Sequence, residues 1–308
     1  MSPLALRGKA RARGLLFASA VFFGLAAILV RLATGAGMGG GQVTLVRFAI
    51  GLGAVAGVFR LRPGTFRPAR WDLLAARGAF GGVAALLYFL AIQRISAGEA
   101  TLLNNTFPIF AVVVSVFALG ERPTLHLAVA LAIASAGVFL VLGGGRIEFR
   151  LGTGEALGIA SAVFGGVAVT AIRALRGGAH VPAPTVFLAF SIGGFLSGVP
   201  FAFGAWPAAP GPWLATAGVG VSSFLAQLAM TEAYGQLSVA EAALWQQLTP
   251  IAAYVLALGV GERVTGATGV GILLGVAGVV YGSVLGRRST EATSPAARAA
   301  PAIPAEEP

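Results

Sequence analysis

The chain repeats itself at a distance of 142 residues, in segments that are apolar enough to cross a membrane. Residues 95–113 read ISAGEATLLNNTFPIFAVV and residues 237–255 read LSVAEAALWQQLTPIAAYV, with eight of the nineteen positions identical. The same offset aligns the ASAVF segments at 18–22 and 160–164. This similarity predicts an internal duplication. Duplicated halves in a polytopic membrane protein are typical of secondary transporters, whose repeats move around a site near the bilayer midplane.

The composition excludes a soluble protein. Apolar residues make up 57% of the 308 residues and charged residues only 10%, and the mean hydropathy is +0.87. Ten mostly apolar runs are each long enough to cross a hydrocarbon core of about 30 Å as a helix. We therefore expect an all-α integral membrane protein with ten transmembrane helices, five in each half. The expected helices span residues 14–34, 42–59, 72–92, 96–119, 124–143, 154–174, 182–204, 212–235, 238–260 and 265–285.

The basic residues predict the topology. If the N-terminus is cytoplasmic, fourteen Lys and Arg side chains fall on the inner side of the membrane and only four fall outside. This bias follows the positive-inside rule and predicts a protein of the cytoplasmic (inner) membrane with both termini in the cytoplasm. Five helices per half then require the second half to enter the membrane upside down, so we expect two inverted repeats around a central cavity. The net charge of +10 does not indicate nucleic-acid binding, because the basic residues form no cluster with aromatic residues.

The predicted organisation has five parts. They are a basic cytoplasmic N-terminus (1–13), a first five-helix repeat (14–143), an external linker (144–153), a second repeat (154–286) and a disordered cytoplasmic tail (287–308). The tail is rich in Ala, Pro, Glu, Ser and Thr and has no apolar periodicity. The chain has no cysteine, and its two histidines fall at expected helix ends or loops, so we expect no metal, no cofactor and no catalytic site.

The main candidate site lies where prolines interrupt the fourth and ninth expected helices. Pro108 and Pro250 have no N–H, so the carbonyls of Asn104 and Gln246, four residues earlier, lose their helical partners. Free carbonyls and amides are costly in lipid, so both breaks should face a water-filled cavity or a polar ligand. The alternative is that kinks and amides only hold helices together. Recurrence of the pattern in both halves favours binding, and the predicted substrate contacts here are Asn104, Asn105, Gln246 and Gln247.

Other polar and amphipathic side chains inside the expected spans are candidate cavity walls. Arg47 is the most costly of these, and it must snorkel, form an ion pair or bind an anionic group such as a substrate carboxylate or phosphate. A structural role for Arg47 and ordinary core packing for the aromatic residues are the alternatives. The remaining candidates are Tyr88, Ser223, Gln227 and Trp245.

Two pairs of charged residues also recur at the offset of 142, Arg31 with Glu99 and Arg173 with Glu241. Inversion would place the first pair near the outer ends of its helices and the second pair near the inner ends. We therefore expect each pair to latch one gate, closing when the other opens. Alternatively, these charges satisfy helix dipoles or the interface. Glu232, near the inner end of the eighth helix, has no equivalent in the first half and is a candidate proton-coupling group.

These features resemble the drug/metabolite transporter superfamily, specifically proteins built from two EamA-type repeats. The most specific resemblance is a proline in the fourth and ninth helices followed by Gly-Glu in the next loop, here Pro108 with Gly120-Glu121 and Pro250 with Gly261-Glu262. The resemblance implies a central cavity lined by the first, third, fourth, sixth, eighth and ninth helices. It also implies export or exchange of small metabolites, often amino acids. The Asn and Gln pairs before the prolines depart from the pattern, which has smaller or more apolar residues there.

We therefore expect a secondary transporter that exports or exchanges small polar or amphipathic metabolites, with amino acids as the expected substrates, by alternating access. Its expected partners are the substrate and the lipid bilayer, with no nucleic acid and no obligate protein partner. The alternatives are a passive channel and a non-catalytic permease subunit of a larger complex. An ATP-driven pump is disfavoured, because it needs a GxxxxGK[ST] loop and the only lysine, Lys9, lies in Arg-Gly-Lys-Ala.

Overall fold

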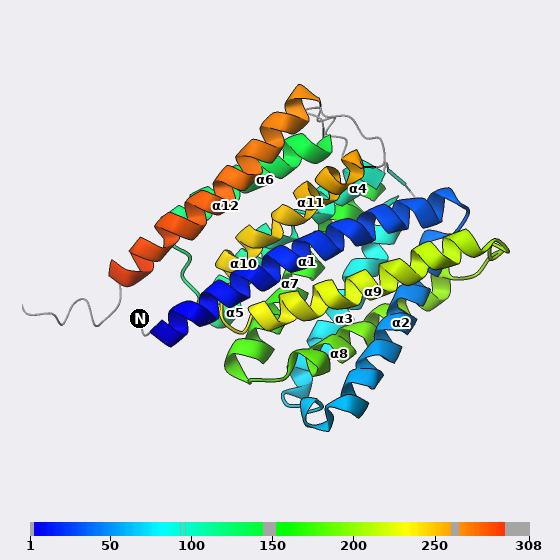
Figure 1. The fold of residues 1–308 in the computed structure, drawn as a ribbon, viewed down its shortest axis with the longest axis horizontal. Coiled ribbons are helices and arrows are strands. Elements are labelled where there is room, and N and C mark those ends of the chain that lie inside the picture. Colours follow the sequence, from blue (N-terminus) through cyan, green and yellow to red (C-terminus); the bar gives the residue numbers. More distant parts are fainter. Residues whose placement is uncertain (1–2, 93, 96, 144–151, 260–264, 293–308) are drawn as a thin grey trace, which may run out of the picture.

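All the regular structure in the described part of the chain is helical, as the apolar runs predict (Figure 1). The computed structural model describes residues 3–92, 94–95, 97–143, 152–259 and 265–292. The helices of the first half are α1 (Pro3–Gly35), α2 (Gly40–Leu61), η1 (Pro63–Thr65), α3 (Trp71–Ile92), α4 (Ala97–Asn104), α5 (Phe107–Leu119) and α6 (Leu125–Gly143). Those of the second half are α7 (Thr153–Arg173), the π-helical η2 (Ala174–Gly178), α8 (Ala183–Gly198), η3 (Val199–Phe201), α9 (Pro210–Ala233), α10 (Val239–Gln246), α11 (Leu248–Leu258) and α12 (Gly266–Ala292).

Eight helical stretches in the described residues are long and apolar enough to cross a membrane. One of them, Ala100–Leu119, contains most of α4 together with α5. The protein is therefore an integral membrane protein with an all-helical fold.

The helices at both ends of the chain are longer than expected. Residues 3–13 form the start of α1 instead of a separate N-terminal segment, and residues 287–292 continue α12 instead of belonging to a disordered tail. Hydropathy marks only the apolar part of a helix, whereas flanks that contain good helix formers such as Ala, Arg and Glu can extend the helix beyond the apolar run. The expected linker residues 144–151 and tail residues 293–308 lie outside the described residues.

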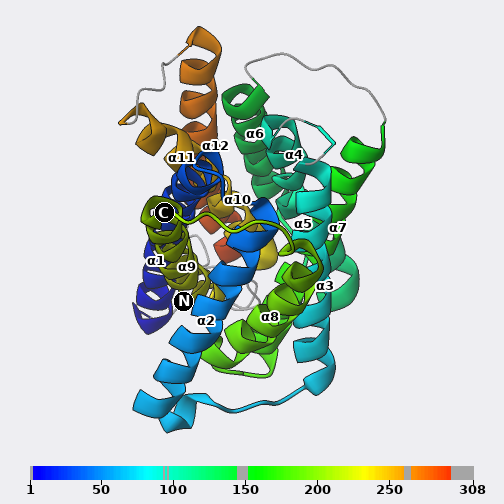
Figure 2. The same ribbon diagram turned by 90° about the vertical axis from the view of Figure 1, so that its right-hand side faces the viewer.

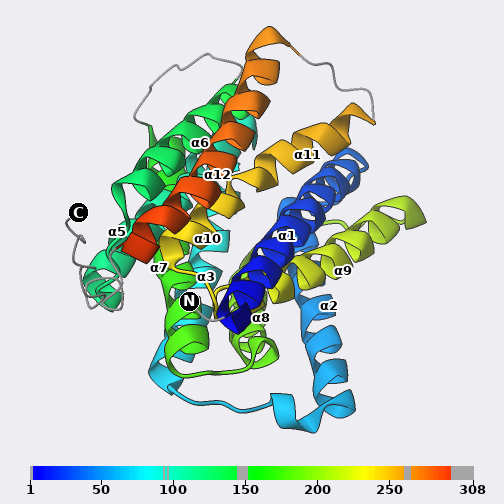
Figure 3. The same ribbon diagram turned by 60° about the vertical axis from the view of Figure 1, so that its left-hand side comes forward.

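Helices at equivalent positions in the two halves have equivalent packing partners, and these partners lie in the opposite half. Helix α1 packs on α9 and α11 of the second half, and its equivalent α7 packs on α3 and α5 of the first half. Helix α2 packs on α8, and α6 packs on α12 (Figures 2 and 3). Each half thus finds main packing partners in the other half.

Glycines permit close approach at several of these contacts. A Cβ atom on Gly24 of α1 would lie 2.7 Å from the backbone nitrogen of Ala253 in α11. A Cβ atom on Gly166 of α7 would lie 2.7 Å from the backbone nitrogen of Ala111 in α5. The two contacts are related residue by residue by the offset of 142, so the same close approach occurs twice. Small residues permit such approaches between membrane helices, where packing supplies much of the association energy.

The contact between α6 and α12 gives a direct test of this packing. A Cβ atom on Gly137 would lie only 2.3 Å from the backbone nitrogen of Gly275, so Gly137→Ala must push the two helices apart. We expect a loss of about 1–3 kcal/mol of stability, the usual range for overpacking, measured as a lower melting temperature of the purified protein in detergent. The matched control is Gly53→Ala in α2, because nothing lies within 4 Å of a Cβ atom there. Equal melting temperatures for the two variants would contradict the close contact.

Candidate functional site

Both helix interruptions lie at the predicted prolines and amides. Helix α4 ends at Asn104 and α5 begins shortly before Pro108, whereas α10 ends at Gln246 and α11 begins shortly before Pro250. Both prolines are buried within the protein and do not face lipid. A proline supplies no N–H, so the preceding turn cannot continue as a regular helix. The two breaks therefore lie at repeat-equivalent positions inside the bundle.

The four amides beside the breaks do not all serve the same purpose. Asn104 Nδ2 donates to Ser161 Oγ of α7 at 2.8 Å, and Gln247 Nε2 donates to Ser135 Oγ of α6 at 2.8 Å. Asn105 donates to the carbonyl four residues earlier in its own helix. The bonds of Asn104 and Gln247 are of the kind that holds helices together, whereas that of Asn105 stays within one helical segment. Gln246 is different, since its buried Nε2 has no hydrogen-bond partner among the described residues.

A second set of polar residues comes together between α2, α3, α8 and α9. Arg77 of α3 is only 4% exposed. Its Nη2 donates to Gln227 Oε1 of α9 at 3.3 Å, and its Cζ lies 3.9 Å from the centroid of the Phe190 ring of α8. The half-buried Arg47 of α2 lies over the Phe48 ring, with Cζ 5.0 Å from its centroid. The two arginines are close enough to interact electrostatically.

Two tyrosines and Gln246 extend this set. Tyr88 of α3 lies within electrostatic range of Arg47, and Tyr234, which follows α9, lies within range of Arg77. Tyr234 is fully buried beside Gln246, yet no hydrogen bond of ordinary geometry joins its hydroxyl to any described residue. We call the following residues the central polar group: Arg47, Arg77, Tyr88, Gln227, Tyr234 and Gln246.

The contacts of the two arginines offset part of the cost of removing them from water, but they leave both positive charges without a counter-charge among the described residues. Neither guanidinium forms an ion pair with a carboxylate in the described part of the chain. A cation–π contact contributes about 0.5–2 kcal/mol. A hydrogen bond to a charged group contributes about 1.5–3 kcal/mol, whereas removing an ion from water costs several kcal/mol. The central polar group therefore has an excess of positive charge that a polar or anionic ligand can neutralise.

The remaining two candidate contacts differ from each other. Ser223 is buried on α9, four residues before Gln227 and so on the same helix face, and its Oγ has no partner among the described residues. Trp245 of α10 packs against two clusters of buried apolar residues. The first position suits the central polar group, whereas the second agrees with ordinary core packing.

Arg173 and Glu241, the two residues expected to latch the inner gate, do not bind each other but each bind a different residue. Arg173 Nε lies 2.9 Å from Glu121 Oε1, and Glu241 Oε1 accepts from Arg13 Nε at 2.8 Å, so the expected pair of Arg173 with Glu241 is wrong in this structure. The reason is the backbone at Gly120, which ends α5 with a φ of +65°. Glycine adopts this left-handed conformation readily, and the turn carries the Glu121 carboxylate back to α7.

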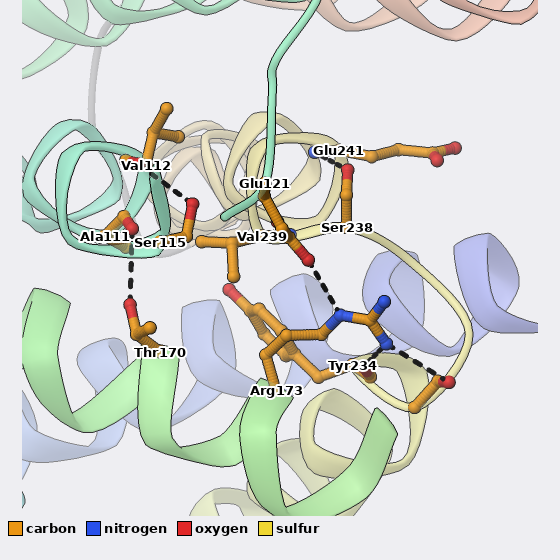
Figure 4. A network of polar contacts seen from close by, with 11 residues as sticks. Ala111, Val112, Ser115, Glu121, Thr170, Arg173, Tyr234, Ser238, Val239 and Glu241 are labelled. Atoms are coloured by element: carbon orange, nitrogen blue, oxygen red, sulfur yellow. Dashed lines mark hydrogen bonds and ion pairs between the residues drawn. The ribbon is translucent and has the colours of Figure 1, made fainter. Parts of the chain in front are cut away.

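Glu121 and its partner Arg173 together connect four parts of the protein, namely the turn after α5, the end of α7, the segment after α9 and the start of α10 (Figure 4). Glu121 Oε1 binds Arg173 at the end of α7, and its Oε2 accepts the backbone N–H of Val239 at the start of α10 at 2.8 Å. A carboxylate is favourable at this position, because the first turn of a helix carries free N–H groups and a partial positive charge. Arg173 Nη1 also donates to the carbonyls of Tyr234 and Gly235 after α9, at 3.2 and 3.4 Å.

A third ion pair joins the same end of the bundle. Glu232 Oε2 lies 2.5 Å from Arg176 Nη2 of η2, and its side chain is 46% exposed. Of the two residues expected to latch the outer gate, Arg31 lies exposed on α1, whereas the side chain of Glu99 lies outside the described residues. We call the paired residues the charged end cluster: Arg13, Glu121, Arg173, Arg176, Glu232 and Glu241.

A comparison with known protein families identifies the kind of protein that has this fold and these helix breaks. The profile of the EamA-like transporter family matches residues 12–143 and again residues 152–283. The chain belongs to the EamA-like transporter family. The resemblance to drug/metabolite transporters with two EamA repeats is thereby confirmed, and the protein is a membrane transporter.

Similarity to solved structures shows the fold of this EamA-like transporter. One crystal structure of a protein matches with a TM-score of 0.77 and 23% identity, over 91% of this chain and 99% of that chain. No curated protein matches this chain.

Several residues of this EamA-like transporter were not predicted. Arg77 lies six residues inside α3, and an arginine within an expected span is the signal that would have found it. Glu121 was noted only as part of the Gly-Glu motif, and its contacts follow from the turn at Gly120. Tyr234 and Arg13 lie at the ends of apolar segments, where a sequence gives little sign of burial.

The buried pair of Arg13 and Glu241 predicts a large effect of charge removal. Both residues are at most 9% exposed, so Glu241→Gln leaves an unpaired buried guanidinium and should cost about 3–5 kcal/mol. We expect a clear fall in melting temperature, largely recovered in the exchanged double variant Arg13→Glu/Glu241→Arg. The control Asp72→Asn breaks an exposed pair with Arg70, which should cost about 0–1 kcal/mol. A shift for Glu241→Gln no larger than that of the control would show that the buried pair is unimportant.

Proposed function

We propose that this protein is a secondary transporter that moves small polar or amphipathic metabolites across the cytoplasmic membrane by alternating access. The observation that carries the proposal is the pair of helix breaks at repeat-equivalent positions, one of which places Gln246 in the central polar group. Interrupted helices beside a polar site between two repeats are a recurrent design of secondary transporters. The EamA-like family assignment supports the same function.

The proposed architecture has ten transmembrane helices in two inverted repeats. Its support is the packing, in which α1 on α9 corresponds to α7 on α3, with the two halves exchanged. In this architecture α4 with α5 forms one broken span, and α10 with α11 forms the other. The distribution of Lys and Arg favours cytoplasmic termini.

We further propose that the charged end cluster closes the cytoplasmic side. Its ion pairs and hydrogen bonds tie α1 to α10, the turn after α5 to α7, and η2 to the end of α9. An inward opening must break several of them, and the pair of Arg31 with Glu99 is the proposed counterpart on the outer side. Glu232 remains the proposed proton-coupling group, in which case protonation would release Arg176.

The proposed substrates include amino acids, as expected from the family resemblance. A passive channel and a permease subunit are the alternative functions. A carrier saturates and exchanges labelled for unlabelled substrate, whereas a channel does neither. Counterflow in liposomes that contain only this protein therefore separates the three functions.

Counterflow also tests the residues at the breaks. In the double variant Asn104→Leu/Gln246→Leu both breaks keep their prolines but lose a polar side chain, so we expect counterflow of labelled amino acids to be abolished. The control is Gln236→Leu, an exposed position after α9. The melting temperature of each variant shows whether the bundle still folds, because Asn104 also bonds Ser161. Unchanged counterflow in the double variant would contradict this assignment.

Alternating access predicts a change in exposure when the end cluster is weakened. The chain has no native cysteine, so a single Ser223→Cys substitution on α9 can report access to the centre. Adding Glu121→Gln removes the ion pair to Arg173 and should favour the inward-open state, about tenfold for each ~1.4 kcal/mol lost by the closed state. The measurement is the rate of labelling by a membrane-impermeant thiol reagent from the cytoplasmic side. Labelling no faster than with Asp72→Asn in the same background would refute closure by the cluster.

A further inference from the structure

The central polar group contains two positive charges and no negative charge. Its titratable side chains are Arg47, Arg77, Tyr88 and Tyr234, and the structure pairs neither arginine with a carboxylate in the residues it describes. The carboxylates of Glu121, Glu232 and Glu241 are occupied by other arginines in the charged end cluster.

The geometry holds these two charges in defined places. The rings of Phe48 and Phe190 meet edge to face at 5.1 Å between centroids, and one arginine lies over each ring. Gln227 accepts from one Arg77 nitrogen, and a guanidinium has further N–H groups that can still donate. Planar guanidinium groups match the geometry of carboxylate and phosphate oxygens, often with two parallel hydrogen bonds.

From this arrangement we infer that the transported substrate is a small metabolite with a net negative charge, whose carboxylate or phosphate groups bind Arg77 and Arg47. This inference rests on the proposed transport function and narrows its substrate class. A neutral amino acid would bring one ammonium group for each carboxylate, and the central polar group offers no acid to bind that ammonium. A dicarboxylate, an acidic amino acid or a phosphorylated metabolite would leave a net anion that balances the arginines.

Ligand-induced stabilisation of the purified protein tests the charge requirement. The probes are succinate, aspartate and inorganic phosphate, with uncharged succinamide and zwitterionic alanine as matched controls, all at the same ionic strength. Only a ligand that prefers the folded state raises the melting temperature. We expect at least one of the three anions to raise it by several degrees and the two controls to leave it unchanged. No shift with any of the three anions, or an equal shift with succinamide, would overturn the inference.

Variants assign the effect to the arginines. Arg77→Gln and Arg47→Gln should each weaken binding of the active anion at least tenfold, as measured by titrating the thermal shift, whereas Arg70→Gln, at an exposed position, should not weaken it. Without ligand, Arg77→Gln should melt no lower than the wild type, because it removes a buried charge that no carboxylate among the described residues balances. A lower melting temperature with unchanged anion affinity would mean that Arg77 has only a structural role.

Counterflow distinguishes failure of this inference from failure of the transport function. Anion binding that depends on Arg77 without any counterflow would support the anion site and contradict transport. Conversely, counterflow of alanine that persists in Arg77→Gln would support transport and overturn the anionic substrate class.

Discussion

A charged side chain buried in a membrane bundle needs a counter-charge, and the described residues provide one in the charged end cluster but not in the central polar group. In the charged end cluster, Arg13, Arg173 and Arg176 each meet a carboxylate. In the central polar group, the contacts of the two arginines with described residues are with aromatic rings and an amide, and none is with a carboxylate. The contrast agrees with the proposed roles of the two regions. The charges that hold a gate closed must be paired within the protein, whereas the charges of a binding site can be paired by the ligand.

The features that depend on local sequence were predictable. A long apolar run gives a helix in lipid whatever its neighbours are, and a proline interrupts such a helix at a known position. The ion pairs depended instead on where the chain turns and how far a side chain reaches. Glu121 reaches Arg173 because of one left-handed glycine, which produces no periodic signal. Arg77 carries the same signal as Arg47, an arginine inside an apolar span, but only the packing shows that the two lie close together.

The amides at the breaks illustrate a further limit of sequence reasoning. Their position predicted polar contacts, but the hydrogen-bond partner of each amide decides whether it joins two helices or belongs to the central polar group. Asn104 and Gln247 each face a serine on a neighbouring helix, so their hydrogen bonds hold helices together. Gln246 faces Tyr234 in the central polar group. Adjacent residues 246 and 247 point to different neighbours because successive helical positions are rotated by about 100°, and only the tertiary packing says which neighbour lies on each side.

The exchange of packing partners between the halves has a consequence for biogenesis. Helix α1 leaves the ribosome long before α9 and α11, on which it packs in the finished protein. During synthesis it must remain in the lipid with glycine-lined faces still uncovered, held only by provisional neighbours. Assembly of the first half is therefore completed only when the last spans arrive, and a nascent chain stopped near its midpoint would present quality-control proteases with an unfinished surface.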